Sequence, residues 1–445
     1  MRGSADRVHL LLRALALSLL AVAAAARAED RPAVVVTNPN EHTFKAAVQE
    51  FAPGAPGLDV AHFRQDLVDA LDFSGIFTSI DPGAFLGPKR TASLGSEPAI
   101  TCPDWAQIGA DALVQGETSA AAGGIAVDFL VWDVPRCRTP LRKRYTGSAS
   151  DSRRIAKRVA DDVVAAFTGK PGVASTELTF ISSRSGSQEV WVMDADGGNQ
   201  RQATRNRAIN AFPSWTPDGS SILYMSYQYL RSPHLFRLVR SGSERPGRLF
   251  ESLDSKAAVY RGVPDPSGQR IAAVVSVDGA PEIFVVDADG RNPRRLTHDP
   301  AIDVSPTWSP DGKRIAFVSD RAGSPNIYVM NDDGSNVKRL TFDGGYNAAP
   351  AWSPDGRWIA YEVRVGGQFD IWLIDPEGQT NAPLVTHPKS DENPTWAPDG
   401  RKLAFASTRR GRSDIYSIDV DGENLRRLTD GAGDNKMPSW GPYPR

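Results

Sequence analysis

Residues Ser305 to Thr341 read SPTWSPDGKRIAFVSDRAGSPNIYVMNDDGSNVKRLT, and this stretch is one copy of a unit that repeats along the second half of the chain. Its tryptophan is Trp308. Counterparts follow at steps of 44 residues, at Trp352, Trp396 and Trp440. Self-similarity at a period of about 20 to 50 residues is typical of repeat architectures and has to be recognised before any local signal is interpreted.

Further copies of the unit lie upstream. Trp215, in SWTPDG, belongs to the same series, and a weakened copy, VPDPSG, has Pro264 at the tryptophan position. A strand-like run similar to IAF in the quoted unit occurs six times, at 178–182, 222–226, 271–275, 315–319, 359–362 and 403–407. The sequence therefore contains six units.

Each unit predicts four short strands, because runs such as IAFVS and NIYVM are β-branched and aromatic and are bounded by Asp-Gly turns. A unit of about 40 to 45 residues with four strands is typical of a β-propeller blade. We expect an all-β six-bladed β-propeller over residues 177–445, preceded by a small α/β domain. The array starts without a tryptophan strand at Glu177 and ends with an unmatched one at 438–440. That last strand should complete the first blade and leave no open edge.

The first 28 residues have the pattern of a secretory signal peptide. Arg2, Arg7 and Arg13 precede an apolar run over 14–26, and small residues flank a cleavage point near Ala28. This predicts an exported protein. The apolar run has 13 residues, too few to cross a bilayer as a helix of about 20 residues, so no membrane insertion is expected.

Composition excludes little. A chain of 445 residues is long enough for two or more domains. It is 40% hydrophobic and 23% charged, and its formal net charge of −2 gives no reason to expect nucleic acid as a partner. Removing residues 1–28 takes away four arginines and one aspartate, so the exported chain is mildly acidic.

Residues 29–168 predict the α/β domain. Apolar residues recur at helical spacing over 62–71 and 152–167, and strand-like runs lie at 33–37, 76–80, 112–116, 125–134 and 141–145. Glycine and proline punctuate 169–176, which we interpret as a short linker. Four basic residues of the last helix lie off its apolar stripe and are expected to face solvent: Arg153, Arg154, Lys157 and Arg158.

The chain has two cysteines, Cys102 and Cys137, both before the repeats. In an exported chain such a pair favours a disulfide, with two buried thiols as the alternative. Two isolated cysteines do not provide the four ligands of a structural metal site.

Two recurring features have a structural explanation. The Asp-Gly segments at 194–197, 287–290, 332–334 and 419–422 are too short for calcium loops of about twelve residues and fit hairpin turns. The repeated tryptophans could form a stacking platform for sugars or bases, but their presence in nearly every unit favours packing between blades.

Polar residues gather at one end of the predicted ring. Five residues before each tryptophan the side chain is Asn or Asp, at Asn210, Asp303, Asn347, Asp391 and Asn435, whereas the weakened unit has Val259. The turn after the second strand carries Arg184, Arg321 or Arg409 in three units. Alternate turns of a meander share an end, so we expect a polar collar around one opening of the central channel. Such loops on a rigid scaffold are a binding-site candidate, and the alternative is that Asn and Asp only bond the local backbone.

Enzyme chemistry has weak support. His298 and His387 fall in the same kind of loop, and a metal-dependent lyase could use them with Asp299 or Asp391, but no ligand spacing recurs. No G-x-S-x-G elbow occurs, which excludes a serine nucleophile of that type. We predict no catalytic residue, no metal and no cofactor.

The repeat, with W-S-P-D-G at 308–312, I-A-F at 315–317 and R-L-T at 339–341, resembles that of the TolB family, periplasmic propeller proteins of the Tol-Pal envelope system. In the first domain, DALDFSGIF at 69–77 is similar to a helix end of that family. The resemblance covers nearly the whole mature chain.

The resemblance implies a non-enzymatic periplasmic adaptor that links envelope layers during cell division and maintains outer-membrane integrity. Such proteins bind the peptidoglycan-associated lipoprotein Pal through the propeller and the inner-membrane protein TolA through the first mature residues, which here include Glu29, Asp30, Arg31 and Val34. On our own argument the Pal contact lies on the collar, where we include His298 and His387. We expect a monomer. A metal-dependent propeller enzyme and a sensor of sugars or peptides remain as alternatives.

Overall fold

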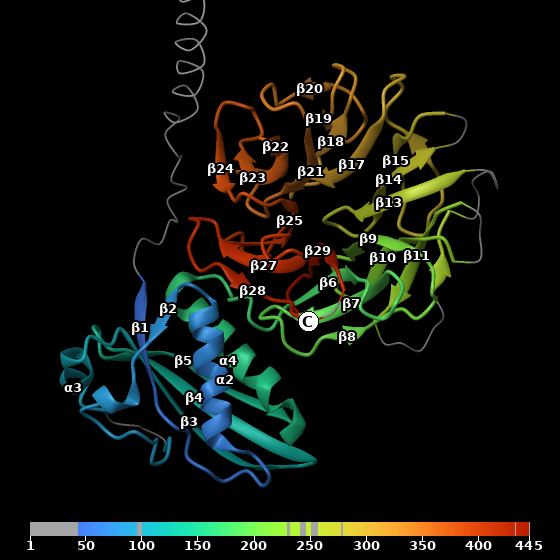
Figure 1. Cartoon of the computed structure of the whole chain (residues 1–445). Helices are drawn as coiled ribbons and strands as arrows, with labels where there is room; N and C mark the ends of the chain where they lie inside the picture. The colour runs from blue at the N-terminus through green and yellow to red at the C-terminus, as the bar shows by residue number, and fades with distance from the viewer. Residues whose placement is uncertain are drawn as a thin grey trace, which may run out of the picture. The chain divides into compact units, whose positions relative to one another are not determined.

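The computed structural model describes residues 43–95, 100–228, 232–240, 246–250, 257–276, 279–431 and 433–444. An α/β domain runs from β1 (Phe44–Val48) to α4 (Ser152–Thr168), and the repeat array runs from β6 (Glu177–Ser182) to β29 (Asn435–Trp440), as Figure 1 shows. The strand expected at 33–37 lies outside the described residues. Within the described ranges, no helix has the length and apolar character needed to cross a membrane.

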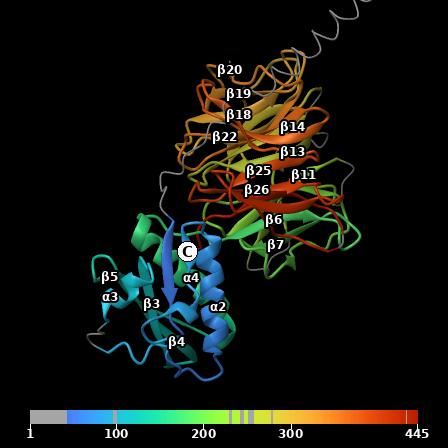
Figure 2. The same cartoon turned by 60° about the vertical axis from the view of Figure 1, so that its left-hand side comes forward.

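The α/β domain contains a five-stranded sheet in the order β2-β1-β3-β4-β5, in which β1 is parallel to both of its neighbours. Helices α2 and α4 pack together against one face, visible in Figure 2, where Ala46 and Val48 of β1 point. The alternate residue Ala47 points to the other face and packs with Trp105 of α3. The remaining elements are α2 (Val60–Phe73), β2 (Phe77–Ser79), η1 (Pro82–Ala84), α3 (Cys102–Gln107), β3 (Ala112–Ala121), β4 (Gly124–Asp133), β5 (Arg138–Gly147) and η2 (Ala149–Asp151).

The two cysteines lie next to each other in the α/β domain. Cys102, the first residue of α3, is bonded to Cys137 in the turn between β4 and β5, with the two Cα atoms 5.9 Å apart. The bond ties a six-residue helix to the sheet it covers.

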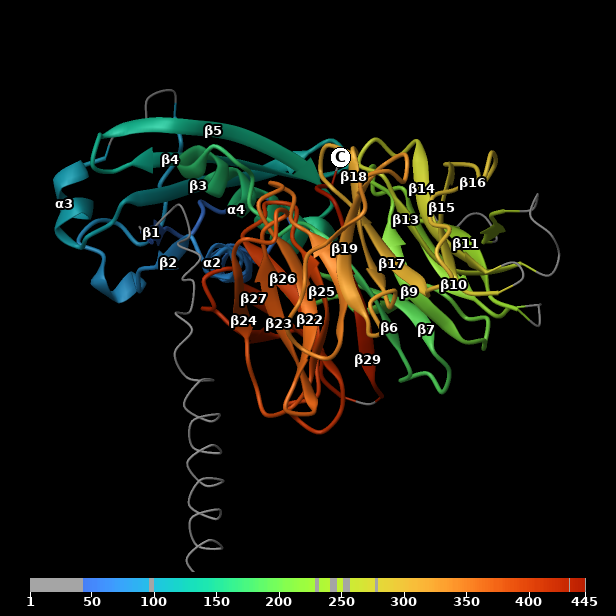
Figure 3. The same ribbon diagram turned by 90° about the horizontal axis from the view of Figure 1, so that it is seen from above.

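Six four-stranded antiparallel sheets stand radially around one axis, seen face-on in Figure 1 and from above in Figure 3. The predicted six-bladed propeller is therefore confirmed. Blade 1 contains β29, β6, β7 (Glu189–Asp194) and β8 (Arg201–Gln202). Blade 2 contains β9 (Asn210–Trp215), β10 (Ser221–Ser226), β11 (His234–Val239) and β12 (Gly247–Arg248). Blade 3 contains β13 (Ala258–Pro264), β14 (Arg270–Ser276), β15 (Glu282–Asp287) and β16 (Arg294–Arg295).

The other three blades repeat the same order of strands. Blade 4 contains β17 (Asp303–Trp308), β18 (Arg314–Ser319), β19 (Asn326–Asn331) and β20 (Lys338–Arg339). Blade 5 contains β21 (Asn347–Trp352), β22 (Ile359–Val365), β23 (Gln368–Ile374) and β24 (Asn381–Val385). Blade 6 contains β25 (Asp391–Trp396), β26 (Lys402–Ser407), β27 (Asp414–Asp419) and β28 (Arg426–Arg427). The inner strands β9, β13, β17, β21, β25 and β29 contact one another in sequence around the axis.

The ring closes as the sequence predicts. Strand β29 pairs antiparallel with β6, with Trp440 opposite Leu178 and Asn435 opposite Ser182. Beyond the strand, the Gly441 N–H donates to the Glu177 carbonyl at 2.8 Å. The tail of the chain thereby supplies the inner strand of the first blade and covers its edge.

The repeated tryptophans pack between blades, as expected. All five are buried, and Trp308 lies in one apolar cluster with Val274 of blade 3 and Phe317 of blade 4. Its indole Nε1 donates to the Val263 carbonyl of the preceding blade at 3.0 Å. Trp396 reaches back to Ala351 in the same way, at 2.9 Å.

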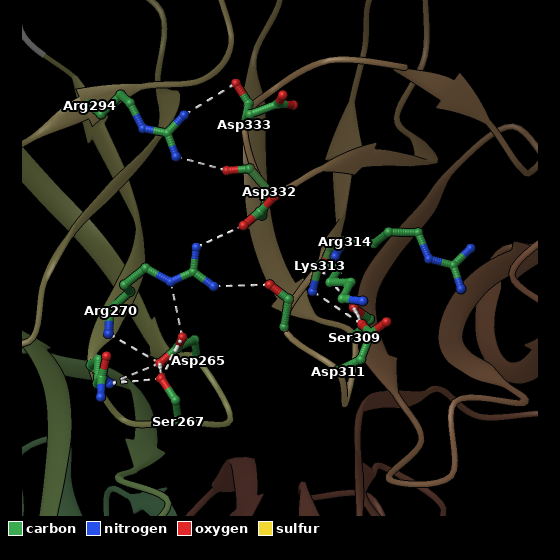
Figure 4. A network of polar contacts seen from close by, with 12 residues as sticks. Asp265, Ser267, Arg270, Arg294, Ser309, Asp311, Lys313, Arg314, Asp332 and Asp333 are labelled. Carbon is green, nitrogen blue, oxygen red and sulfur yellow. Dashed lines mark hydrogen bonds and ion pairs between the residues drawn. The ribbon is translucent and has the colours of Figure 1, made fainter.

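The Asp-Gly turns lie at the end of the blades opposite the end at which the inner strands begin. Gly290 and Gly334 have φ of 86° and 90°, a region that favours glycine, so these segments are hairpin turns as predicted. Between blades 3 and 4, Arg270 donates to the Asp332 carboxylate at 2.8 Å and the Gly312 carbonyl at 3.0 Å, as Figure 4 shows. The same guanidinium bonds Asp265 of its own blade at 3.0 Å. One arginine therefore joins two blades.

The basic face of α4 is not simply solvated, and for Lys157 the sequence prediction is wrong. Lys157 is buried, with its Nζ 2.7 Å from Asp194 and 2.8 Å from Asp196, where β7 turns into β8 in blade 1. Arg153 pairs with Asp196 at 2.8 Å. The acidic turn packs on the side of the helix opposite its apolar stripe. Arg154, in contrast, is exposed as expected.

The linker is held by a buried carboxylate. Asp161 of α4 accepts hydrogen bonds from the Ala174 and Ser175 N–H groups at 2.8 and 2.9 Å. Burial raises the pKa of Asp161 to about 6, because the charged form loses solvation that these bonds only partly replace. Residues 174 and 175 are therefore fixed to the helix before the propeller begins.

Candidate rim site of the propeller

A repeated arginine module forms the end of the ring at which the inner strands begin. In blade 4, the Arg321 Nη2 donates to both carboxylate oxygens of Asp303, at 3.0 and 2.9 Å, and its Nε donates to the Ser319 hydroxyl at 2.8 Å. The guanidinium also lies over the rings of Phe317 and Tyr328, 5.5 and 5.1 Å from their centroids. Stacking and the charge-assisted bonds of one nitrogen to both Asp303 oxygens together fix its orientation.

Blades 1 and 6 build the same module. Arg184 Nη2 donates to Asn435 Oδ1 at 2.8 Å, and Arg409 Nη2 donates to Asp391 Oδ1 at 2.9 Å. Each also bonds the serine two residues before it and stacks on an aromatic pair: Phe180 and Trp191 in blade 1, Phe405 and Tyr416 in blade 6. Burial lowers the pKa of Arg184, and Asp430 and Asp414 partly oppose this effect.

The Asn and Asp side chains of the predicted collar are buried beneath this end of the ring and form hydrogen bonds there. Asn210, Asp303, Asn347, Asp391 and Asn435 are all fully buried. Among the described residues of blades 2 and 5 no arginine bonds to the Asn at this position, and the amide groups bond neighbouring blades. Asn210 donates to Glu189 at 3.2 Å, and Asn347 donates to Asn326 at 3.1 Å. A buried side chain does not touch a partner, so these five residues position the neighbouring residues that a partner would contact.

The weakened unit lacks the module. Val259 of blade 3 stands where the other units have Asn or Asp, and it is buried in an apolar cluster with Leu235 and Val275. The arrangement of the rim is therefore not sixfold, and the arginine modules lie in blades 1, 4 and 6.

The sequence analysis missed a group of exposed apolar side chains on the same end of the ring. Ile209, Ile302 and Tyr346 directly precede Asn210, Asp303 and Asn347, and Phe342, 71% exposed, lies in the loop that leads to Tyr346. Tyr227 directly follows β10, and Val365 is the last residue of β22. We call Ile209, Tyr227, Ile302, Phe342, Tyr346 and Val365 the rim apolar group. For Ile209, Ile302 and Tyr346 the signal in the sequence was an apolar residue one position before the repeated Asn or Asp, which three of the five units have.

The two histidines do not form a common centre with metal ligands. His298 is exposed and lines a cavity of about 600 Å³ with Glu282, Arg295 and Asp299. His387 is half-buried, and its Nδ1 accepts from the Lys389 N–H at 3.1 Å. Across the residues that the structure describes, no group of three or more His, Cys, Asp or Glu side chains is placed to hold a metal ion. The predicted amino-terminal contacts Glu29, Asp30, Arg31 and Val34 lie outside those residues.

Comparison with known proteins agrees with this architecture. Residues 164–444 match the family described as TolB beta propeller domain, and residues 32–139 match the TolB amino-terminal domain. The chain belongs to the TolB family. Among curated relatives, the Tol-Pal system protein TolB of Anaeromyxobacter dehalogenans is 39% identical over 303 residues, covering 66% of this chain and 67% of the relative. That of Desulfosudis oleivorans is 37% identical over 270 residues, covering 59% and 60% of the two chains.

A solved structure extends the match to both domains. The crystal structure of TolB from Acinetobacter baumannii has a TM-score of 0.74 and 26% identity, covering 91% of this chain and 98% of that chain. The match to TolB therefore includes both the amino-terminal α/β domain and the propeller of this chain. Both curated relatives named above are proteins of the Tol-Pal system.

Proposed function

We propose that this chain is a non-enzymatic adaptor of the Tol-Pal system in the periplasm. It binds the peptidoglycan-associated lipoprotein Pal through the rim of the propeller and TolA through the first residues of the mature chain. In this role it contributes to outer-membrane integrity and to envelope constriction during cell division. The proposal rests on membership of the TolB family and on the surface of the rim.

The observation that carries the proposal is the rim apolar group next to the arginine modules. Ile302 and Tyr346 are 47% and 38% exposed although they are large and apolar. Single exposed apolar residues are ordinary, whereas aromatic and apolar residues gathered on one face with arginine are typical of protein interfaces. Arg321 and Arg409 retain 20% and 12% side-chain exposure, so each presents an edge while the buried acid behind it fixes its position.

The rigidity of this surface favours binding of another folded protein. The arginines are held by bonds to Ser and to Asp or Asn and by stacking on two rings, so little side-chain freedom is lost when a partner docks. We expect Pal to place apolar side chains on the rim apolar group and acidic groups near the exposed guanidinium edges of Arg184, Arg321 and Arg409.

A pull-down from envelope extract tests the adaptor role. The mature chain as bait should recover Pal, and bait that lacks residues 29–36 should recover Pal but lose TolA. Recovery of neither protein would contradict the proposal. Manganese or calcium retained on purification would favour a metal-dependent enzyme, and a rise in melting temperature with a sugar or peptide would favour a sensor.

A further inference from the structure

A cavity of about 490 Å³ lies between helix α4 and the first two blades of the propeller. Its lining comes from the segment 150–158, from blades 1 and 2, and from Pro444. Val159 of α4 and Leu178 of β6 belong to the same buried apolar cluster, so both walls of the cavity are parts of one packed core. A cavity of this size lies within the range of small-molecule sites, about 300 to 1,000 Å³.

The lining carries more positive than negative charge. Three acidic residues line the cavity, Asp151, Glu177 and Asp194. The basic residues that line it number six: Arg153, Arg154, Lys157, Arg158, Arg201 and Arg240. Charge of one sign on a concave surface concentrates ions of the opposite sign. The cavity therefore favours an anion.

Two arginines converge on one carboxylate at the propeller wall. Arg201 Nη2 lies 2.8 Å from Glu177 Oε1, and Arg240 Nη2 lies 2.6 Å from Glu177 Oε2. The two arginine side chains are nevertheless 48% and 46% exposed. Glu177 orients one nitrogen of each guanidinium, and an arginine has five N–H donors, so both can also bond an oxyanion.

Arg240 is a departure from the repeat. Its N–H donates to the Ser220 carbonyl at 2.9 Å, just before the second strand of blade 2. The residues that make the same main-chain bond in blades 1, 3, 4 and 6 are Ala195, Ala288, Asp332 and Val420. None of these four is basic, so a blade can be built without a cation here. Because Arg201 already balances the charge of Glu177, Arg240 adds a positive charge to the cavity.

The helix wall supplies two further arginines. Arg154 is 66% exposed and pairs with Asp151 at 2.8 Å. The Arg158 guanidinium lies over the ring of Tyr145, 5.3 Å from its centroid, and stacking occupies the face of a guanidinium and not its N–H edge. Residues four apart on a helix are neighbours on its surface, so Arg154 and Arg158 lie on one side of α4.

We propose that this cavity binds a small ligand that carries more than one phosphate group, held by Arg201 and Arg240 on the propeller wall and by Arg154 and Arg158 on the helix wall. Guanidinium forks match phosphate oxygens in paired, charge-assisted hydrogen bonds. Arginines on two walls suit a ligand with several phosphates, because a single phosphate engages fewer of them. The site includes no residue of the arginine modules or the rim apolar group, so it does not depend on the proposed adaptor role.

Isothermal titration of the mature full-length chain with tripolyphosphate tests the site, with inorganic phosphate and citrate as controls. Tripolyphosphate should bind at least about tenfold more tightly than either control. Arg240→Ala, which introduces the residue that blades 1 and 3 already have, and Arg158→Gln should each weaken tripolyphosphate binding at least about tenfold. Arg201→Gln should do the same and replaces Arg240→Ala if that variant does not fold.

A matched control removes an exposed guanidinium elsewhere. Arg291→Ala alters a side chain that is 78% exposed and pairs with Asp289, so the affinity for tripolyphosphate should not change. Absence of tripolyphosphate binding to the native chain would overturn the proposal. So would equal binding of citrate, which would indicate a general anion site, or binding that survives both Arg240→Ala and Arg158→Gln.

The phosphate groups could belong to a soluble molecule or to a lipid, and sedimentation with phosphatidylcholine vesicles that contain geranylgeranyl diphosphate distinguishes the two sources. Sedimentation of the native chain but not of Arg240→Ala would support the site with a lipid-linked ligand. Binding of tripolyphosphate without sedimentation would support the site with a soluble ligand.

Discussion

The Arg409 Nη2 lies 2.9 Å from Oδ1 of Asp391, whereas Oδ2 of the same buried carboxylate has no hydrogen-bond partner among the described residues. The neighbouring blade places Asp370 close enough to Asp391 to raise its own pKa, after burial as the larger cause. In the corresponding place of blade 1, Asn435 donates its amide to Asp414 at 3.2 Å. The boundary between blades 5 and 6 thus has two acids, Asp370 and Asp391, where the boundary between blades 6 and 1 has an acid and an amide.

Asp391→Asn should stabilise the protein. The amide would keep an acceptor for Arg409 and add a donor toward Asp370, removing a like-charge contact, and the expected gain is about 1 kcal/mol in the free energy of unfolding. Asp391→Ala should cost about 2 to 3 kcal/mol, because it leaves the guanidinium without its partner. Urea unfolding of both variants measures these changes, and an asparagine variant less stable than the native chain would show that the interpretation of Asp391 is wrong.

Glu362 should make stability depend on pH. Its folded pKa, raised to about 7 by burial, lies above the ordinary value of 4.5, so the protonated form favours the folded state. This contribution is complete below about pH 4.5 and is lost as the pH rises to about 7, by at most about 3.5 kcal/mol. The groups around it are Arg261, Glu392, Tyr346 and Asn393.

Unfolding measured from pH 5 to 8 tests this prediction. Glu362→Gln should be more stable than the native chain at pH 8 and nearly equal to it at pH 5. Asp161, whose pKa is also raised by burial, contributes to both proteins and cancels in the difference. Parallel stability curves across the whole range would refute the role of Glu362.

Arg270 should contribute to cohesion between blades 3 and 4. Arg270→Met removes the bonds to Asp332 and Gly312 shown in Figure 4 and leaves Asp265 buried without its cation, at an expected cost of about 2 kcal/mol. Arg291→Met, on the exposed pair with Asp289, should change stability by less than about 0.5 kcal/mol. Equal losses in the two variants would mean that the bridge between blades is not what stabilises this face.

Closure of the ring should depend on Trp440. Its indole is buried at the seam, and its Nε1 donates to the Thr176 hydroxyl at 2.8 Å. Trp440→Ala should cost about 3 to 5 kcal/mol through lost packing, whereas Trp440→Phe should cost roughly half as much because the ring remains. Thermal unfolding checks both values, and a native-like alanine variant would show that the seam is held elsewhere.

The propeller was predictable because each blade repeats the same pattern of strands and turns. The period places Trp308 and its counterparts, and the unmatched strand at 438–440 predicts the closure with β6. Repetition tests each local interpretation several times within one chain. The α/β domain offers no such repetition: β1 at Phe44–Val48 and α3 at Cys102–Gln107 went unrecognised, since a five-residue strand and a six-residue helix give little periodic signal.

The rim was predictable in composition but not in exposure. Sequence spacing brings Asp303 and Arg321 to one end of the ring, and the structure joins them. Spacing does not show that Asp303 is buried under the loop while its neighbour Ile302 is exposed, because that depends on how neighbouring blades cover the strand end. The same limit applies to Lys157, whose burial results from an acidic turn far along the sequence.

The central claim, that the rim binds Pal, is tested most directly by isothermal titration of purified Pal against one triple variant and one double variant. One carries Ile302→Ser, Phe342→Ser and Tyr346→Ser on the rim. The control carries Val337→Ser and Leu425→Ser, which are 41% and 45% exposed beside the Asp-Gly turns at the other end of the blades. We expect the rim variant to bind Pal at least about tenfold more weakly and the control to match the native chain. Native affinity in the rim variant, with loss in the control, would contradict the claim.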